Sequence, residues 1–188
     1  MLATLELTRR EYFSAGVARG SRAMVSPNYV GQMPAPSRLL IDGPNVLHAS
    51  REWAVLLRRD KDAARRRLQE SAQIVRDGTD WQVTLVFDGR GTDLTIERPD
   101  GDDTFVVIHT SSGMTGDDVI ERLVGGSAAP ARCRVVSGDR AIQSTVRALG
   151  AEAMTPADFL AWLEQLAVQG ARRINRQSMA TEGVWRKA

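Results

Sequence analysis

The sequence is poor in cysteine, histidine and lysine. Its 188 residues include one cysteine, Cys133, and two histidines, His48 and His109. These counts exclude a disulfide framework and a zinc site built from Cys and His ligands. Lysine occurs only as Lys61 and Lys187, so nearly all of the 25 basic residues are arginine. No apolar run approaches the roughly 18 residues that a membrane span needs, and we expect a cytoplasmic protein with no membrane partner.

The composition is that of an ordinary folded domain. Hydrophobic residues make up 43% and charged residues 26% of the chain, which argues against wholesale disorder. The formal net charge is only +2, so the composition permits an anionic partner but does not require one.

The chain divides into three parts. Residues 1–36 lack sustained periodicity and end in Pro34 and Pro36, which predicts a poorly ordered N-terminal extension. A targeting segment and an over-extended translation start, with Met24 or Met33 as the true start, both remain open for it. We expect one folded domain over residues 37–169, followed by a basic, weakly patterned C-terminal tail over residues 170–188.

Short apolar segments alternate with amphipathic ones throughout the central part. We expect strands at residues 39–41, 82–87, 93–97, 104–108, 133–136 and 152–154. We expect helices at residues 60–76, 115–125, 140–149 and 155–166. This alternation predicts an α/β fold, with a mainly parallel sheet covered by helices on both faces.

Acidic residues recur where the predicted strands end. Asp42 and Asp88 each stand before a glycine at a strand end, Asp139 follows a glycine after a third strand, and Asp117 and Asp118 begin a helix after a fourth. The carboxyl ends of parallel strands lie along one edge of a sheet, where ligands bind. The spacing therefore predicts an acidic rim at that edge.

Crowded carboxylates point to a hard cation. Like charges a few ångströms apart disfavour joint ionisation, and oxygen ligands select Mg²⁺ or Mn²⁺ over softer metals. For any one of these aspartates, a turn or helix-capping role is the better explanation. Four such elements on one edge favour the metal site.

Four segments carrying these aspartates also resemble a known family. The segments Leu39–Val46, Val86–Gly89, Thr115–Arg122 and Val135–Arg140 resemble, in order and spacing, the successive motifs of the YacP-like NYN domains, which belong to the PIN-like nucleases. The resemblance extends over residues 38–168. It implies a PIN-like three-layer α/β/α sandwich and a metal-dependent endoribonuclease. The expected substrate is RNA, single-stranded or messenger, and some family members cut mRNA on the ribosome.

The resemblance assigns roles to particular residues. By matching motifs, the metal ligands are expected to be Asp42, Asp88, Asp117 and Asp139. Asp118 and Asn45 complete the catalytic set, with Asn45 either bonding the scissile phosphate or fixing Asp42. Three residues near the rim aspartates are expected to contact RNA: Arg90, Ser137 and Arg140. For Ser137, holding Asp139 or a metal-bound water is the alternative role. The run Arg65–Arg67 is expected on the solvated outer face of its helix.

Three positions depart from the family pattern. Pro44 stands where the family usually has tyrosine, Gly116 replaces a usual alanine, and Ser137-Gly138 replaces a usual Thr-Ser. None of these changes removes a carboxylate, but Pro44 removes an aromatic group beside the first aspartate.

Other functions fit the residues less well. A non-catalytic module that binds RNA or the ribosome on the same fold is the main alternative, although an acidic rim does not help to bind a polyanion. A phosphatase of the doubly wound type needs an Asp-x-Asp after the first strand, which Asp42-Gly43-Pro44 does not supply. A dinucleotide-binding protein needs a Gly-x-Gly-x-x-Gly there, and none is present.

Overall fold

The structure is a computed structural model that describes residues 37–185. The expected N-terminal extension, residues 1–36, lies outside the described residues. The strands are β1 (Arg38–Asp42), β2 (Gln82–Gly91), β3 (Thr95–Glu97), β4 (Phe105–Ser111), β5 (Cys133–Val136) and β6 (Glu152–Met154). The helices are α2 (Gly43–Ala49), α3 (Arg51–Arg59), α4 (Lys61–Gly78), α5 (Gly116–Gly125), the short 3-10 helix η2 (Pro130–Arg132), α6 (Arg140–Ala148) and α7 (Pro156–Trp185).

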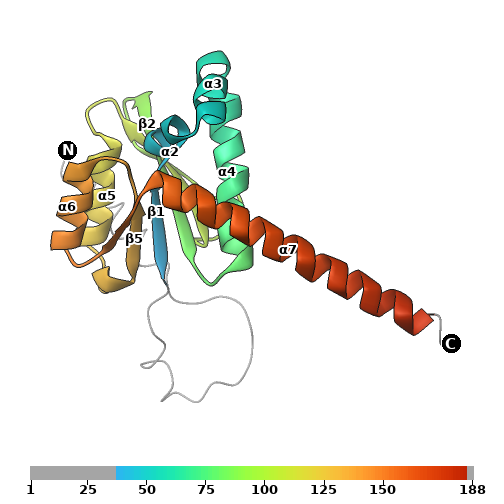
Figure 1. Cartoon of the computed structure of the whole chain (residues 1–188). Helices are drawn as coiled ribbons and strands as arrows, with labels where there is room; N and C mark the ends of the chain where they lie inside the picture. The colour runs from blue at the N-terminus through green and yellow to red at the C-terminus, as the bar shows by residue number, and fades with distance from the viewer. Residues whose placement is uncertain (1–36, 186–188) are drawn as a thin grey trace.

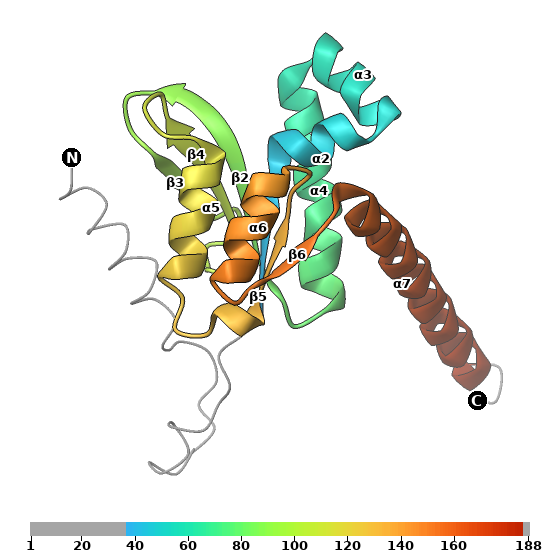
Figure 2. The same cartoon turned by 60° about the vertical axis from the view of Figure 1, so that its left-hand side comes forward.

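The strands form one six-stranded sheet in the order β3-β4-β2-β1-β5-β6. Every pairing is parallel except that of β3 with β4. Helices α2, α4 and α7 cover one face of the sheet, and α5 and α6 cover the other (Figures 1 and 2). The predicted three-layer α/β/α sandwich with a mainly parallel sheet is confirmed.

Successive residues of the central strands point to opposite faces and fill two separate cores. Leu39 and Ile41 of β1 pack with Leu68 of α4 and Phe159 of α7. Leu40, between them, packs with the residues of α5 and α6. Strands that are buried on both faces read as continuous apolar runs, which is why the sequence predicted them well.

Two helices between β1 and α4 were not predicted. Asp42 caps α2 by accepting a hydrogen bond from the Asn45 amide, and Pro44 lies in the first turn, where its missing N–H costs nothing. Ser50 then ends α2 and caps α3. These caps divide the segment into helices of 7 and 9 residues, too short for a clear helical period in the sequence.

The C-terminal helix is longer than predicted. Helix α7 continues to Trp185 (Figure 1), so most of the segment expected to be an unpatterned tail is helical. Its two glycines, Gly170 and Gly183, each cost the helix only about 1 kcal/mol, and no proline follows Pro156 to stop it. None of the helices over residues 37–185 combines the length and the apolar composition that crossing a membrane requires.

Helix α7 is fastened to the sheet by its first turns, which yields a stability prediction. Phe159 is fully buried, so we expect Phe159→Ala to lower the free energy of unfolding by about 3–5 kcal/mol. Val168, 50% exposed in the same helix, is the matched control. Val168→Ala should change stability by no more than about 0.5 kcal/mol in the same urea titration, and equal losses in both variants would contradict this account of how α7 docks.

Candidate active site

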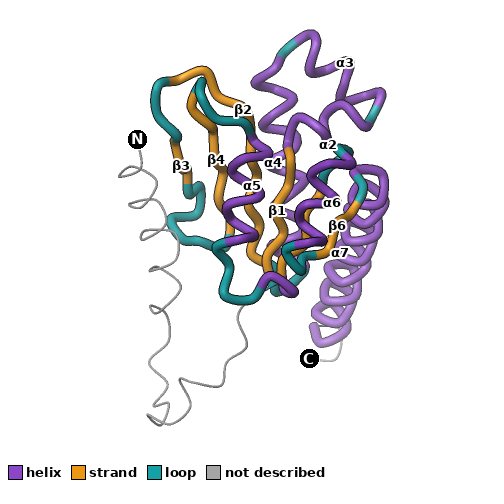
Figure 3. The backbone as a smooth tube through the Cα atoms, turned by 90° about the vertical axis from the view of Figure 1, so that its left-hand side faces the viewer, coloured by secondary structure: helices purple, strands orange, loops and turns teal. Residues whose placement is uncertain are grey.

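The acidic rim forms because the strand pairing aligns the aspartates on one face. In the parallel pairing of β1 with β2, Asp42 lies beside Val86. Val86 belongs to the core under α5 and α6, and Asp88 follows it by two residues. Side chains two apart along a strand share a face. Asp42 and Asp88 therefore lie on the face of the sheet that α5 and α6 cover, and Figure 3 shows both of these helices on one face of the sheet. The starts of α5 and α6 carry Asp117 and Asp139.

Asp42 is the most buried member of the cluster and the most firmly held. It is 5% exposed. Its Oδ2 accepts hydrogen bonds from Asn45 Nδ2 at 2.5 Å and from Ser137 Oγ at 3.0 Å. Burial raises the pKa of Asp42, the hydrogen bonds from Asn45 and Ser137 oppose that rise, and the nearby charge of Asp88 adds to it. Of the two roles expected for Asn45, the structure shows the one that fixes Asp42.

Ser137 links two of the aspartates and cannot contact RNA as expected. Its side chain is fully buried. Its hydroxyl donates to Asp42, and its oxygen accepts from the Asp139 amide at 3.1 Å. Asp139 in turn caps α6 through the Ala141 amide at 2.6 Å. Ser137 is therefore a positioning residue between β1 and the start of α6.

Asp88 stands at the exposed end of β2, where two strands approach each other closely. Its Oδ1 accepts a hydrogen bond from the Gly116 amide at 3.0 Å, which ties it to the start of α5. The next residue, Gly89, leaves no room for a side chain, because a Cβ there would lie 1.9 Å from the Thr110 carbonyl oxygen. The Asp88-Gly89 pair is thus a requirement of packing as well as a turn signal.

The pKa of Asp117 is raised by its burial and by the neighbouring carboxylates. Its pKa is raised to about 6, first by burial and then by the charges of Asp42, Asp139, Asp88 and Glu121. Asp117 is therefore within electrostatic reach of the other three predicted metal ligands. Within the described part of the chain, none of the four forms an ion pair with a basic side chain.

Asp118 behaves differently from its neighbour. Its carboxylate turns back to the helix start, where Oδ2 accepts from the Thr115 amide at 3.0 Å and from the Thr115 hydroxyl at 2.9 Å. These bonds form a capping box and lower the pKa of Asp118. The structure thus gives Asp118 a capping role and leaves it outside the cluster.

The donor set suits a hard cation, although its side chains are not arranged as a preformed site. Among the described residues, no three Asp, Glu, His or Cys side chains are spaced to hold one ion as they stand. Asp42, Asp88 and Asp139 each direct an oxygen at a backbone N–H near the start of a helix. Their remaining oxygens, together with the charge that raises the pKa of Asp117, fit a divalent ion that prefers oxygen ligands.

The basic residues near the rim divide into two kinds. Arg90 and Arg140, expected to contact RNA, are both exposed beside the rim. Arg65 was expected on the solvated face of its helix, and that expectation is wrong. It is half-buried, it donates a hydrogen bond to the Asp88 carbonyl oxygen at 2.9 Å, and its guanidinium lies 5.2 Å from the centre of the Phe87 ring. A run of three arginines gives no signal that one of them points inward.

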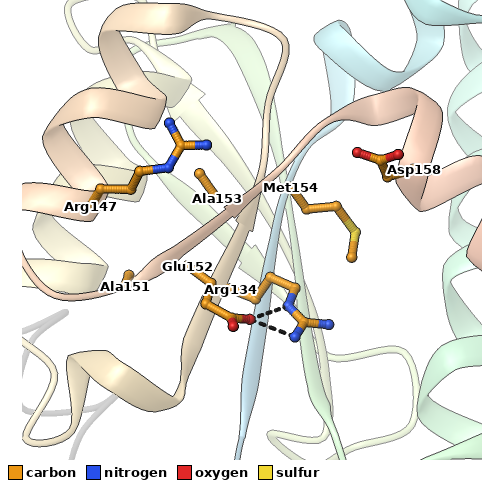
Figure 4. Close-up of a pocket in the computed structure, with 7 residues that line it drawn as sticks. All are labelled: Arg134, Arg147, Ala151, Glu152, Ala153, Met154 and Asp158. Atoms are coloured by element: carbon orange, nitrogen blue, oxygen red, sulfur yellow. Dashed lines mark hydrogen bonds and ion pairs between the residues drawn. The ribbon is translucent and has the colours of Figure 1, made fainter.

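A larger cavity lies apart from the cluster, beside the edge strand β6. It measures about 570 Å³ and is bordered by Arg134, Arg147, Met154 and Asp158 (Figure 4). Arg134 is paired with Glu152 across it, and Asp158 is engaged by the Thr155 hydroxyl. None of the four aspartates of the cluster lines this cavity, so its size does not make it the active site.

Comparison with known proteins agrees with the fold. A family model described as the YacP-like NYN domain matches residues 39–187. The chain belongs to the YacP-like NYN domain family. Two solved structures share its fold. Rae1 (YacP) from Bacillus subtilis is 23% identical, the match covers 77% of this chain and 83% of that chain, and the TM-score is 0.61. A point mutant of the same protein is also 23% identical, the match covers 75% of this chain and 82% of that chain, and the TM-score is 0.61. No curated protein sequence matched the chain.

Membership of this family indicates the general class of function. The fold is PIN-like and of nuclease type, which supports a nuclease or other RNA-related function. The four aspartates Asp42, Asp88, Asp117 and Asp139 are the acidic residues that this chain brings together on that fold.

The neighbouring aspartates Asp117 and Asp118 should affect stability in opposite directions. In metal-free protein at pH 7, we expect Asp117→Ala to raise the free energy of unfolding by about 1–2 kcal/mol, after allowing for solvent screening. Asp118→Ala, which removes a cap from the same helical turn, should lower it by about 0.5–1 kcal/mol.

The pH dependence of unfolding in EDTA checks the cause. A folded-state pKa of about 6, above the ordinary 3.8, means that the folded protein binds a proton that the unfolded chain releases. Stability therefore falls as pH rises from about 4 to about 6. The gain from Asp117→Ala should vanish near pH 4, and a gain of equal size at pH 4 and pH 7 would contradict a raised pKa of Asp117 in the folded protein.

Proposed function

We propose that this protein is a metal-dependent endoribonuclease that hydrolyses RNA phosphodiester bonds. The observation that carries the proposal is the rim itself: four carboxylates from four separate elements, close enough to raise the pKa of Asp117, with no basic partner among the described residues. Strongly perturbed carboxylates cluster at functional sites, and a bound cation would offset the repulsion.

The metal would be held by Asp42, Asp88, Asp117 and Asp139. Mg²⁺ or Mn²⁺ suits these oxygen donors. When bound, such an ion activates water and stabilises charge on a phosphoryl group.

The chain's own residues prepare the rim for this ion and for RNA. Ser137 and Asn45 hold the Asp42 carboxylate in one orientation, and Ser137 also holds the backbone of Asp139. Arg90 and Arg140 are exposed beside the rim and supply positive charge for phosphates flanking the scissile one.

The family resemblance supports a more specific substrate. It favours single-stranded or messenger RNA in the cytoplasm, cut in association with the ribosome. One assay separates cleavage of free RNA from cleavage on the ribosome. Labelled single-stranded RNA is incubated with the protein and Mg²⁺, Mn²⁺ or EDTA, and a parallel reaction contains ribosomes charged with the same message. Cleavage only in the ribosome-containing reaction would support the ribosome-dependent form.

A binding module without catalysis is the second candidate. It is favoured by one observation, that the described carboxylates are not spaced as a preformed metal site. It is opposed by the rim's charge, which repels phosphate in the absence of a cation.

Neutralising one aspartate should separate cleavage from binding. We expect Asp42→Asn to reduce RNA cleavage at least about 100-fold, while RNA binding in EDTA is retained or strengthened because repulsion falls. Asp42 also caps α2, so its substitution could reduce cleavage by disturbing that helix. Asp88 is exposed and does not cap α2, and we expect Asp88→Asn to reduce cleavage in the same way. Normal cleavage by either folded variant, verified by thermal unfolding, would show that the cluster is not the active site.

Replacing the rim arginine should weaken binding alone. We expect Arg140→Ala to lower affinity for single-stranded RNA by several-fold, and to reduce the slope of log affinity against log salt by about 0.7, the value for one phosphate contact. Fluorescence anisotropy at several salt concentrations measures both quantities. An unchanged slope would remove Arg140 from the RNA interface.

A further inference from the structure

A second cavity borders Asp88 on the other side of the sheet from the carboxylate cluster. It measures about 290 Å³, near the lower end of the usual range for small-ligand sites. It lies where β2 ends, between that strand, α2 and α4. Asp88 borders it, while Phe87, which points to the opposite face from Asp88, forms part of its wall.

The lining of this cavity differs in charge from the acidic rim. Lys61 and Arg65 of α4 supply two cations, and the exposed His48 of α2 supplies a ring nitrogen donor or acceptor. Pro44 and Leu57 form an apolar wall. A cationic side beside an apolar side suits a nucleotide, which has a charged phosphate and a flat, largely apolar base.

Arg65 is held in place before any ligand arrives. One of its terminal nitrogens donates to the Asp88 carbonyl oxygen, and its plane lies over Phe87. A guanidinium carries five N–H donors, so this anchoring leaves others for a phosphate. The same bond ties the cation directly to the backbone of a residue in the carboxylate cluster.

Lys61 stands where a helix does not favour a cation. It is the first residue of α4, at the positive end of the helix dipole. Within the described part of the chain, neither Lys61 nor Arg65 forms an ion pair with a carboxylate. Both positive charges are therefore available to an anion that enters the cavity.

We propose that this cavity, which we call the Lys61–Arg65 pocket, binds one nucleotide of the RNA strand next to the scissile phosphate. Its phosphate would contact Lys61 and Arg65, and its base or ribose would lie against Pro44 and Leu57. The assignment rests on the proposed function, because it takes the cluster on the far side of Asp88 as the cleavage site. A strand crossing the end of β2 passes from one site to the other.

The pocket also selects the form of the RNA. Its volume suits one nucleotide that is separated from its neighbours, whereas the bases of a duplex remain stacked and paired. Single-stranded RNA should therefore bind through this pocket and double-stranded RNA should not. The preference follows from this chain's Pro44, Lys61 and Arg65, not from the carboxylates.

The test is a charge reversal measured by binding. We expect Lys61→Glu to weaken binding of a labelled single-stranded RNA in EDTA about tenfold, and to reduce the salt slope by about 0.7. The matched control is Arg66→Glu, an equal change of charge at an exposed position of α4 that does not line the pocket. Arg66→Glu should change affinity by less than about twofold, and duplex RNA of the same sequence should not distinguish the two variants.

The outcomes separate this inference from the proposed function. If Lys61→Glu and Arg66→Glu weaken binding equally, the pocket is overturned, while RNA cleavage by the parent protein would still stand. If Lys61→Glu alone loses binding but the parent cuts no RNA with Mg²⁺ or Mn²⁺, the pocket stands and the nuclease proposal fails. If the parent binds no single-stranded RNA, the pocket is overturned directly. Arg65→Lys keeps the charge but loses the planar fork, so it should weaken binding by less than Lys61→Glu.

Discussion

The hydrogen bond from Ser137 to Asp42 is the interaction on which the rim depends. It joins the end of β1 to the segment after β5 inside the protein, where neither group can bond to water instead. Because the Ser137 oxygen also accepts from the Asp139 amide, one buried hydroxyl sets the relation between two aspartates that are far apart in the sequence. Without this link, repulsion would favour their separation, and α2 and α6 would each lose a firmly held N-terminus.

The surrounding elements reduce the repulsion within the rim in different ways. Helix starts supply backbone N–H groups to Asp42, Asp88 and Asp139, so one oxygen of each carboxylate has a hydrogen-bond donor. Asp117 receives no such bond among those described and shows the largest rise in pKa. Three carboxylates of the rim therefore have hydrogen-bond donors from helix starts, whereas the charge of Asp117 is left to be offset by a cation or a proton.

Much of this arrangement was predictable from the sequence, and the misses have physical reasons. Buried strands are apolar on both faces, and the aspartates that end them followed from the strand pattern. Thr115 with Asp118 is a sequence signature of a capping box, which could have removed Asp118 from the catalytic set. The burial of Ser137 depends on the position of the next strand, which the local sequence does not give. The inward turn of Arg65 depends on its contacts with the Phe87 ring and the Asp88 carbonyl, which are distant from it in the sequence.

The length of α7 has a consequence for the shape of the molecule in solution. A helix of 30 residues extends about 45 Å, and Figure 1 shows that only its first part lies against the sandwich. Phe159 and Leu163, near the start of the helix, are buried in the core, while the later part of the helix projects from the sandwich (Figure 1). The protein is therefore more elongated than the sandwich alone, and it should tumble more slowly than a compact protein of the same mass.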